Sequence, residues 1–576
     1  MVRPQTKKIL IVDGKSNAAR SVLQSLGAAG YRCCIAATDL DASTFASRYA
    51  TWTAIYPSPL TDRSGFESWV LDFQRQHQFD LIMPTTEASL IPLHEMRPHP
   101  LLDDVLAIPS IEAVNGAFNK EKVHQLAQSL DIPTPDSLLV RTLEELDQPE
   151  ICDWISQGAV VVKPIRSKVW ADADAAELQV KMVSDQDELH EVVAAFLSHT
   201  PVQLQQWVPG IGVGIELLAN QGEMVLTFAH QRIHEVPLTG GGSSYRMSID
   251  PPPNLVQASA RLMAAYRWHG VAMVEFRVDP KSGRYWLMEI NGRFWGSLPL
   301  AVFAGADFPL ALVELLLFER NPSGPPPRAG AYCRYFARDI LWIKAILVNR
   351  DDRPTLLKRP LVSSLMEWNR VWLGKETWDG ASFRDPGPML HEVTETLRNE
   401  TRIVITKVKR LALLRDARKK SERRLAALSG KRKILVLCYG NICRSPYVAH
   451  RLQQQMGAMD LEIRSSGFHQ KTNRPSPLFL QNAAKRHGID LDAHRSSIIR
   501  HEDLVWADQI LVMDQRNYQQ LLEMDAAFAE KVIWLAVAGK GRSVEIADPY
   551  DLDSKAVEEI LSQMDDCVTG FLAYYS

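Results

Sequence analysis

The sequence predicts a multidomain α/β protein with two separate parallel sheets and an α+β region between them. Two observations support this fold class. Short apolar runs alternate with helical stretches over residues 8–84, and the same alternation returns from residue 433 onward. Strands that alternate with helices in this way form parallel sheets. Between these two regions, from residue 159 to residue 290, strand-like runs dominate and helices are only interleaved.

The chain has 576 residues, which is too long for one hydrophobic core, so we expect roughly three or four domains. The expected domains are a β/α domain over 1–115, an α+β domain over 116–325, a helical extension with a basic linker over 326–430, and a doubly wound parallel-sheet domain over 431–576. A Pro/Gly-rich break at 321–330 and an apolar helix expected over 332–348 mark the second boundary.

The composition indicates a cytoplasmic protein that is soluble or peripheral to a membrane. Hydrophobic residues make up 46% of the chain and charged residues 23%, and the formal net charge of -3 gives no reason to expect nucleic acid as a partner. Seven scattered cysteines form no disulfide framework and suit a reducing cytosol. The first apolar run is typical of a strand rather than a signal peptide, and no run approaches the ~20 residues of a transmembrane helix.

The segment 402–433 is strongly basic, with thirteen Lys or Arg residues against two acids. Val404, Val408, Leu411 and Leu414 recur in it at helical spacing, which predicts a helix with one apolar face. Two interpretations remain open. The helix is either a solvated connector between domains or a basic amphipathic helix that makes peripheral contact with an acidic membrane.

The segment 433–449 reads as a buried strand, a tight loop and a helix, and Cys438 and Arg444 bracket five residues of the loop. Backbone N–H groups of such a loop can form an anion cradle, and the following helix adds its positive end. A thiol at this position loses its proton easily, so its thiolate can attack phosphorus. The planar guanidinium of Arg444 can bind two phosphate oxygens.

Other residues around this loop fit the same chemistry. Asn441 tolerates a left-handed backbone and can lock the loop, and Ser445 can hydrogen-bond the thiolate as it leaves. Asp548, held beside a proline, is the candidate acid for the leaving oxygen and the later base for water. Cys443 is either a partner for a protective disulfide with Cys438 or a packing residue.

The run CYGNICRSP, residues 438–446, resembles the signature of low-molecular-weight protein-tyrosine phosphatases, and the resemblance continues through 464–467 and 507–517 to the loop at Asp548. It implies that Cys438 is the nucleophile, Arg444 the phosphate binder and Asp548 the acid, with a phosphorylated protein or a small phosphomonoester as substrate. It also implies that Tyr439 and Tyr550 line the entrance. A phosphopeptide-binding domain without turnover is the alternative.

In the first half of the chain, Lys120 begins a predicted helix and Lys163 ends the strand-like run 160–163. Two lysines presented by separate elements can hold the α- and β-phosphates of a nucleotide. Gln205 and Gln206 form a polar strand end that suits an adenine and ribose edge. These four residues, together with Arg293, therefore predict an ATP site.

Glu275, Glu289 and Asn291 lie on two further strand-like runs. Alternating residues of a strand point the same way, so Glu289 and Asn291 face one spot. Carboxylate and amide oxygens are the ligands that Mg²⁺ prefers, and Mn²⁺ accepts the same set. Arg293 continues this face and can bind an acid or an acyl phosphate.

These residues resemble the ATP-grasp superfamily, in the branch of carbamoyl-phosphate synthase and biotin carboxylase, over roughly residues 1–320. The resemblance rests on AFNKEKVHQLAQSLDIPTP, VVVKP and the pair VEFRVD and WLMEINGRFWG. It implies a β/α domain ahead of the grasp, Mg-ATP as cofactor, and ligation of a small-molecule carboxylate to an amine through an acyl phosphate. The family's glycine-rich flap is replaced after Lys163 by residues 165–170, which contain no glycine. The alternative is a non-catalytic ATP-binding module that regulates the phosphatase.

Overall fold

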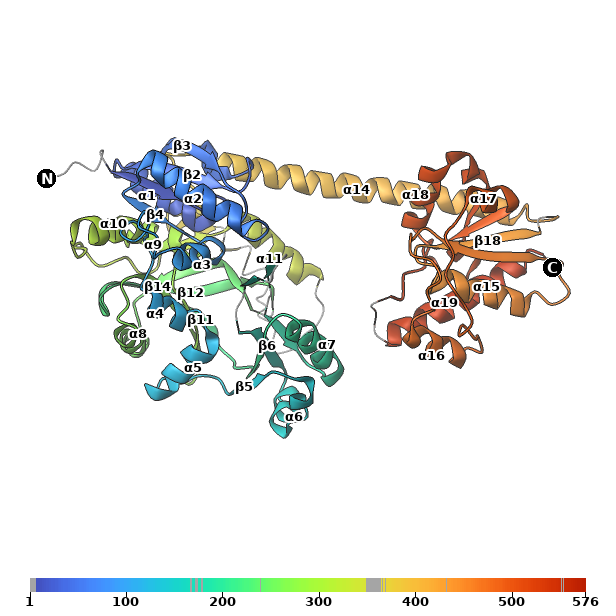
Figure 1. The fold of residues 1–576 in the computed structure, drawn as a ribbon, viewed down its shortest axis with the longest axis horizontal. Coiled ribbons are helices and arrows are strands. Elements are labelled where there is room, and N and C mark those ends of the chain that lie inside the picture. The colour runs from blue at the N-terminus through green and yellow to red at the C-terminus, as the bar shows by residue number, and fades with distance from the viewer. Residues whose placement is uncertain are drawn as a thin grey trace. The chain divides into compact units, whose positions relative to one another are not determined.

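The structure is a computed structural model that divides into two compact units, Met1–Leu397 and Arg398–Ser576 (Figure 1). It describes residues 7–165, 168–170, 175–177, 180–238, 240–348, 364, 366–367, 369–430, 432–550, 552 and 554–575. One helix, α14 (Gly387–Leu425), continues through the boundary between the two units.

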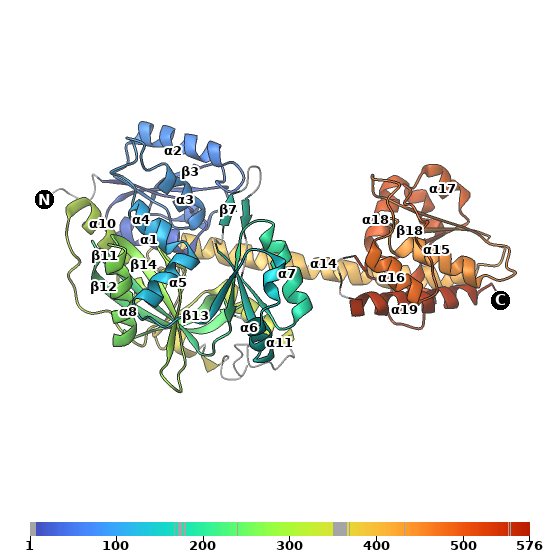
Figure 2. The same ribbon diagram turned by 60° about the horizontal axis from the view of Figure 1, so that its bottom comes forward.

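The first unit begins with a parallel four-stranded sheet of order β3-β2-β1-β4. Its strands are β1 (Lys8–Ile11), β2 (Arg32–Ala37), β3 (Ala50–Ile55) and β4 (Leu81–Met83). The helix α1 (Asn17–Ala28) packs on one face, whereas α2 (Arg63–His77) and α3 (Glu87–Glu95) pack on the other (Figure 2). Because both faces are covered, β1 is almost entirely apolar.

A second, antiparallel sheet of order β5-β10-β6-β9 carries two of the predicted site segments. Its strands are β5 (Ser137–Val140), β10 (Val202–Gln206), β6 (Val160–Pro164) and β9 (Lys181–Val183). The helices α6 (Pro149–Ser156) and α7 (Gln186–Leu197) share a hydrophobic core with this sheet. The opposite face of the sheet therefore stays available for polar side chains.

The largest sheet of the first unit has the order β15-β14-β11-β12-β13-β16-β17. Its strands are β11 (Ile211–Asn220), β12 (Glu223–Val236), β13 (Gly242–Ile249), β14 (Gly270–Val278), β15 (Tyr285–Asn291), β16 (Tyr332–Arg334) and β17 (Glu376–Trp378). Val213, Ile215 and Leu217 of β11 pack with α8 (Pro253–Ala265) in one core. Since side chains alternate along a strand, Gly212, Gly214 and Glu216 belong to the opposite face.

On that opposite face, towards one end of the sheet, α9 (Leu298–Ala304) and α10 (Phe308–Phe318) share a core with α1. The shorter helices α4 (Ile111–Ala117) and α5 (Lys120–Ser129) lie with α8 on the first face. Within the described ranges no single helix has the length and apolar composition to span a bilayer, although α9 and α10 reach that composition as a pair bent by 87°.

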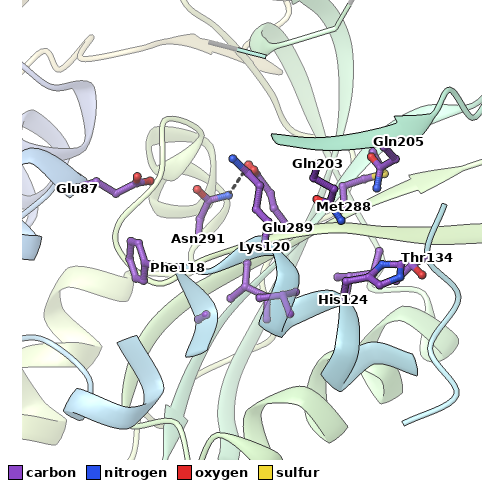
Figure 3. A pocket seen from close by; sticks show the side chains of 14 residues that line it. Glu87, Phe118, Lys120, His124, Thr134, Gln203, Gln205, Met288, Glu289 and Asn291 are labelled. Carbon is purple, nitrogen blue, oxygen red and sulfur yellow. Dashed lines mark hydrogen bonds between the residues drawn. The ribbon is translucent and has the colours of Figure 1, made fainter. Parts of the chain in front are cut away.

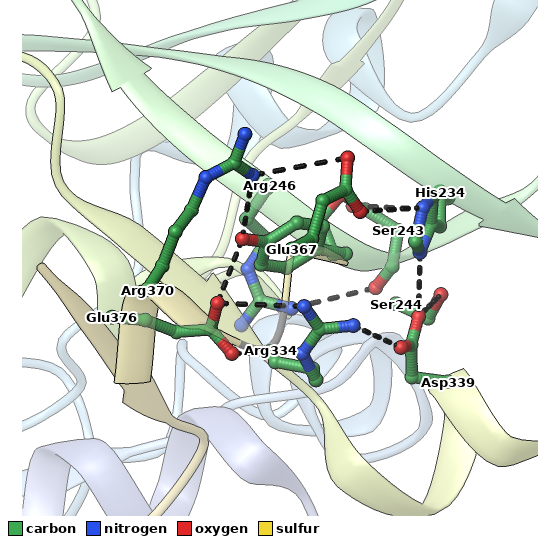
Figure 4. A network of polar contacts seen from close by, with 10 residues as sticks. His234, Ser243, Ser244, Arg246, Arg334, Asp339, Glu367, Arg370 and Glu376 are labelled. Carbon is green, nitrogen blue, oxygen red and sulfur yellow. Dashed lines mark hydrogen bonds and ion pairs between the residues drawn. The ribbon is translucent and has the colours of Figure 1, made fainter. Parts of the chain in front are cut away.

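The strands β16 and β17 join the large sheet through a buried network of charged groups (Figure 4). Arg334 Nε donates to Glu376 at 2.8 Å, and Tyr245 Oη donates to the same carboxylate at 2.7 Å. Arg334 also pairs with Asp339, which lies 2.8 Å from His234 Nδ1. The single helix predicted over 332–348 is therefore divided, because residues 332–334 pair as a strand and only α11 (Phe336–Val348) is helical.

The second unit holds a parallel sheet of order β19-β18-β20-β21, with helices on both faces. Its strands are β18 (Lys433–Cys438), β19 (Glu462–Gly467), β20 (Gln509–Val512) and β21 (Val532–Trp534), and its main helices are α15 (Arg444–Gln455), α16 (Leu478–Arg486), α17 (His501–Trp506), α18 (Gln515–Met524) and α19 (Ser554–Leu572). Ala417 and Leu425 of α14 are part of the core of this unit.

The predicted fold class is confirmed. A β/α region precedes an α+β region with two antiparallel-rich sheets, and a separate parallel-sheet region follows. The order β19-β18-β20-β21 places the long apolar strand β18 in an interior position, where its buried residues pack on both faces.

We expect Glu376→Ala to lower the free energy of unfolding of the first unit by about 3 kcal/mol, because it removes one carboxylate partner of the fully buried Arg334 guanidinium. Urea denaturation followed by intrinsic fluorescence measures the change. Lys375→Ala, at an exposed neighbouring position, is the matched control and should have no effect. An unchanged midpoint for the Glu376 variant would mean that this network does not hold β17.

Candidate functional site

The loop after β18 surrounds the sulfur of Cys438 with hydrogen-bond donors. Cys438 is 2% exposed, and its Sγ lies 3.0 Å from Ser445 Oγ at the start of α15. The backbone N–H of Asn441 donates to the same Sγ at 3.3 Å. The sulfur is therefore contacted by a backbone donor of the loop and by a side chain in the first turn of the helix.

Asn441 locks this loop in place. Its φ of 48° is left-handed, a conformation that asparagine tolerates better than most residues. Its side-chain amide donates to Ser445 Oγ at 3.0 Å and to Ser465 Oγ at 3.1 Å, and its Oδ1 accepts from the Ser497 N–H at 2.8 Å. Gly467 of β19 approaches so closely that a Cβ there would lie 2.8 Å from the Asn441 nitrogen.

Arg444 joins the loop to two aspartates from distant parts of the chain. The arginine is 1% exposed, and its Nη2 lies 2.6 Å from Asp548 and its Nη1 2.5 Å from Asp514. Burial works against the charged form, but the charges of Cys438, Asp548 and Asp514 outweigh burial and raise the pKa of Arg444. The structure therefore brings together Cys438, Arg444 and Asp548, as the sequence predicted.

Sequence reasoning gave Asp514 no role, although a signal for it was present. Asp514 follows β20, which is the parallel neighbour of β18. The carboxyl ends of neighbouring parallel strands meet at one edge of a sheet, so a carboxylate there lies near the loop after β18. His494, whose Nε2 is 2.7 Å from the Asn441 carbonyl oxygen, was also not identified as a loop contact.

The remaining residues predicted near this loop have different environments. Cys443 is 3% exposed, and burial raises the pKa of its thiol. The Tyr439 ring lies under the Arg516 guanidinium at 3.5 Å. Tyr550 is 50% exposed and its ring lies 6.3 Å from that of Phe479.

In the first unit, the polar face of the large sheet and the β10–β6 edge of the smaller sheet line a cavity of about 490 Å³. Seven of the eight predicted ATP and metal residues line it, namely Lys163, Gln205, Gln206, Glu275, Glu289, Asn291 and Arg293. Lys120 lines an adjoining pocket together with Gln205, Glu289 and Asn291 (Figure 3). The predicted set is therefore gathered at one place from five separate elements.

Both lysines have lowered pKa values. Lys163 is 8% exposed, and its burial lowers its pKa to about 8 even though Glu289 favours the charged form. Burial also lowers the pKa of Lys120, whose Nζ donates to the Pro164 carbonyl oxygen at 3.0 Å. One buried and one half-buried ammonium group beside an open cavity are suited to anionic phosphate oxygens.

Glu275 and Glu289 are direct neighbours across β14 and β15. The Asn291 amide nitrogen lies 3.3 Å from Glu275 and 3.1 Å from Glu289. Burial and the charge of Glu289 raise the pKa of Glu275, whereas Lys120, Asn291 and Lys163 outweigh burial and lower that of Glu289. Two adjacent carboxylates fit a hard divalent cation, and the Asn291 amide, whose nitrogen faces them here, would present its oxygen after a flip of the amide.

Among the described residues no cluster of three or more His, Cys, Asp or Glu side chains could hold a metal ion. The candidate cation site therefore depends on the amide of Asn291 as its third donor. Arg293 is 3.0 Å from Glu87 of α3, so a residue of the first β/α region lines a pocket that adjoins the cavity.

Two glycines of β11 shape the cavity, and sequence reasoning did not identify their role. A Cβ on Gly212 would lie 2.7 Å from Arg232 Cδ, and one on Gly214 would lie 2.4 Å from His230 Cε1. Because these glycines have no side chain, the side chains of Arg232 and His230 can extend from β12 over the backbone of β11. Arg232 Nη2 then lies 2.5 Å from Glu275. The available signal was Gly-Val-Gly inside a strand, which indicates close approach by a neighbour.

The segment without glycine after Lys163 is only partly described. Arg166 and Ser167 lie outside the described residues, and for Lys168–Trp170 the structure gives a short strand, β7, paired with β8 (Ala175–Glu177). Thr239 of the glycine-rich turn 239–244 is also outside the described residues.

Two family models match the chain. Residues 433–575 match "Low molecular weight phosphotyrosine protein phosphatase", and residues 198–338 match "ATP-grasp in the biosynthetic pathway with Ter operon". The probable low molecular weight protein-tyrosine-phosphatase EpsP of Ralstonia nicotianae is 33% identical over 131 residues, which are 23% of this chain and 87% of that protein. A protein-arginine-phosphatase of Geobacillus stearothermophilus is 30% identical over 118 residues, 20% of this chain and 78% of that protein.

Among solved structures, the L-amino acid ligase from Bacillus licheniformis aligns with 57% of this chain and 78% of its own, with 18% sequence identity and a TM-score of 0.45.

We expect Asn441→Ala to lower the free energy of unfolding of the second unit by about 3 kcal/mol, because it removes three buried hydrogen bonds and places alanine at a positive φ. Asn441→Gly is the matched control, since it removes the same bonds without the backbone strain. Its cost should be smaller by about 1 kcal/mol. Equal costs for the two variants in chemical denaturation would show that the left-handed backbone adds nothing.

Proposed function

The chain belongs to the low-molecular-weight phosphotyrosine protein phosphatase family through residues 433–575 and carries an ATP-grasp region, and from this we propose that it is a bifunctional enzyme. One activity hydrolyses phosphomonoesters through a phosphocysteine. The other binds Mg-ATP and activates a carboxylate for ligation to an amine. The free state of all seven cysteines supports our assignment of the protein to a reducing cytoplasm.

For the phosphatase, the supporting observation is that Arg444, at the base of the loop around Cys438, lies 2.6 Å from Asp548. Cys438 Sγ attacks the phosphorus while Arg444 binds two of its oxygens. Asp548 donates a proton to the leaving oxygen and then takes one from the water that cleaves the phosphocysteine. Ser445 and Asn441 stabilise the thiolate when it leaves, through the contacts at 3.0 and 3.3 Å.

We propose a phosphotyrosyl protein as the substrate of this domain. Tyr550 is two residues from Asp548 and half exposed, and Tyr439 is next to Cys438, so two aromatic rings flank the reacting groups in sequence. Rings in these positions can stack on a phenyl ring. A protein phosphorylated on arginine offers no such ring, and a small aryl phosphate offers no further protein contacts.

For the ATP-grasp region, the supporting observation is the convergence of Lys120 and Lys163 on Glu289 beside the cavity. The two lysines bind phosphate oxygens of the nucleotide, and Gln205 and Gln206 at the end of β10 hydrogen-bond the adenosine. Lys163 is on β6, which pairs with β10, so one sheet positions both ends of the nucleotide.

Glu275, Glu289 and Asn291 are the proposed ligands of the divalent cation. Mg²⁺ or Mn²⁺ held by these three residues would supply positive charge to the phosphate oxygens during transfer. Arg293 orients the carboxylate that receives the phosphoryl group, and an amine then displaces phosphate from the acyl phosphate. Small-molecule carboxylates and amines are the proposed substrates.

We expect Cys438→Ser to abolish hydrolysis of aryl phosphates, since a hydroxyl at this position is not ionised. Asp548→Asn should slow hydrolysis by about 10²–10⁴-fold, and more for phenyl phosphate than for an activated ester whose leaving group needs no proton. Steady-state rates with both esters measure this. Cys443→Ser is the control and should retain turnover. Hydrolysis by Cys438→Ser at the unmodified rate would exclude the phosphocysteine.

We expect the affinity of the free protein for ATP to fall as the pH rises through about 8, because Lys163 loses its proton there and is charged below that pH. Lys163→Arg keeps the charge and should remove this dependence between neutral pH and pH 9. Lys163→Ala should weaken ATP binding by about 10–100-fold. Calorimetric titration measures these affinities, and aryl phosphate hydrolysis should be unchanged in all three proteins. A pH-independent affinity in the unmodified protein would contradict this role.

Measuring the release of ADP distinguishes a ligase from a regulatory ATP-binding module. Incubation of the protein and Mg-ATP with mixtures of carboxylates and amines should release ADP only when a carboxylate is present. ATP binding without such release would instead favour a non-catalytic ATP-binding module that serves the phosphatase.

A further inference from the structure

The helix α14 exposes a row of large apolar side chains to solvent. Leu390, Leu397, Val404, Val408 and Leu411 are between 56% and 59% exposed. Single exposed leucines are ordinary in proteins, whereas a contiguous apolar row marks an interaction surface. None of these five residues contributes to the two candidate sites.

The row has the spacing of a coiled-coil seam. Leu390, Leu397, Val404 and Leu411 follow one another at intervals of seven, and Thr394, Thr401 and Val408 fill the intermediate positions at steps of four and three. These seven residues are called the seam below. Leucine and valine fill five of these seven positions, as in two-stranded coiled coils, and Thr394 and Thr401 are polar positions within the seam.

The seam differs from the face of α14 that packs within the second unit. Ala417, Ser421 and Leu425 are the buried positions of that face, and Ser421 Oγ accepts a hydrogen bond from the Trp534 N–H. At 100° per residue, Ala417 and Ser421 lie about 80–140° around the helix from Val404 and Leu411, whereas Leu425 lies only about 40–60° away. Arg415 occupies the next heptad position and ends the seam.

The charges along α14 favour a second copy of the same helix in the opposite direction. Residues 390–400 carry Glu395 and Glu400 in addition to Glu392, which pairs with Arg20 of the same chain, against one arginine. Residues 405–415 carry Lys407, Lys409 and Arg415 in addition to Arg410, which pairs with Glu545 of the same chain, and no acid. Antiparallel pairing places the acidic segment of each copy against the basic segment of the other, whereas parallel pairing would put like charges together.

We propose that the seam joins α14 of two copies of this chain as an antiparallel coiled coil. Alternating seam positions then face each other, with Leu397 opposite Val408 of the second copy and Thr401 opposite Val404 of the second copy. In this register the Glu400 carboxylate of each copy flanks the Lys407 ammonium of the other. The contact uses the same surface on both copies, so the assembly is a closed dimer that leaves no seam for a third copy.

An acidic membrane is the other surface that a basic helix with an apolar face could contact. The heptad spacing favours the second copy, because a membrane requires a broad apolar face and does not require a repeat of seven. The carboxylates at one end of the seam also disfavour an acidic membrane along its whole length.

Sedimentation equilibrium of the full chain across a concentration series tests this proposal. The unmodified protein is expected to reach twice the mass of the chain. The double variant Val404→Glu/Leu411→Glu, on an exposed helix face, is expected to stay at the mass of one chain with unchanged circular dichroism. Ile403→Glu is the matched control, since Ile403 is 47% exposed on the same turn but outside the seam, and it should still form the dimer.

Cysteine cross-linking tests the orientation, in a Cys152→Ser background because Cys152 is exposed. Mixed Leu397→Cys and Val408→Cys proteins are expected to form a disulfide-linked pair, and Leu397→Cys alone is not. Linkage of Leu397→Cys to itself would overturn the antiparallel pairing. The proposed seam would be wrong if the unmodified protein stayed a monomer at all concentrations, or if the double variant still formed a dimer. A monomer that sediments with phosphatidylserine vesicles would assign α14 to a membrane surface instead.

Discussion

A buried charge needs a partner of opposite sign, and this requirement holds both candidate sites of the protein together. Arg444 is almost fully buried, and Asp514 and Asp548 supply its partners from two separate loops. Without that guanidinium the two carboxylates would repel each other beside the sulfur of Cys438. The pairing thus positions the proposed acid, and it also leaves the arginine charged for the phosphate that it is proposed to bind.

The candidate nucleotide site of the first unit balances its charges in an open arrangement. Lys120 and Lys163 lie near Glu289, and Arg232 pairs with Glu275, so the cavity contains positive and negative groups in close balance. A nucleotide brings negative charge and a divalent cation brings positive charge, so the pair can enter together without leaving any group uncompensated. The network at Arg334 and Glu376 shows a closed form of the arrangement, in which Arg334 and its two carboxylate partners are buried.

Most residues of the two candidate sites could be predicted from the sequence because each group is carried by a short local pattern. Cys438, Asn441, Arg444 and Ser445 lie within eight consecutive residues of a strand, loop and helix, so their proximity is set by local geometry. Glu289 and Asn291 share one strand face for the same reason. Asp514 was not identified, because its role depends on which strands become neighbours, and β20 beside β18 is a tertiary fact.

The sequence by itself determined the alternation of strands and helices, the two chemically distinct halves of the chain and the identity of the reacting groups, since these follow from local spacing and side-chain chemistry. Only the tertiary structure determined that residues 332–334 pair as β16 instead of continuing the predicted helix. The buried arginine network stabilises this strand pairing more than a longer helix would be stabilised. The tertiary structure also decided that Gly212 and Gly214 open the cavity to Arg232 and His230. A glycine in a strand makes such room only when the side chain of a neighbouring strand extends over its backbone.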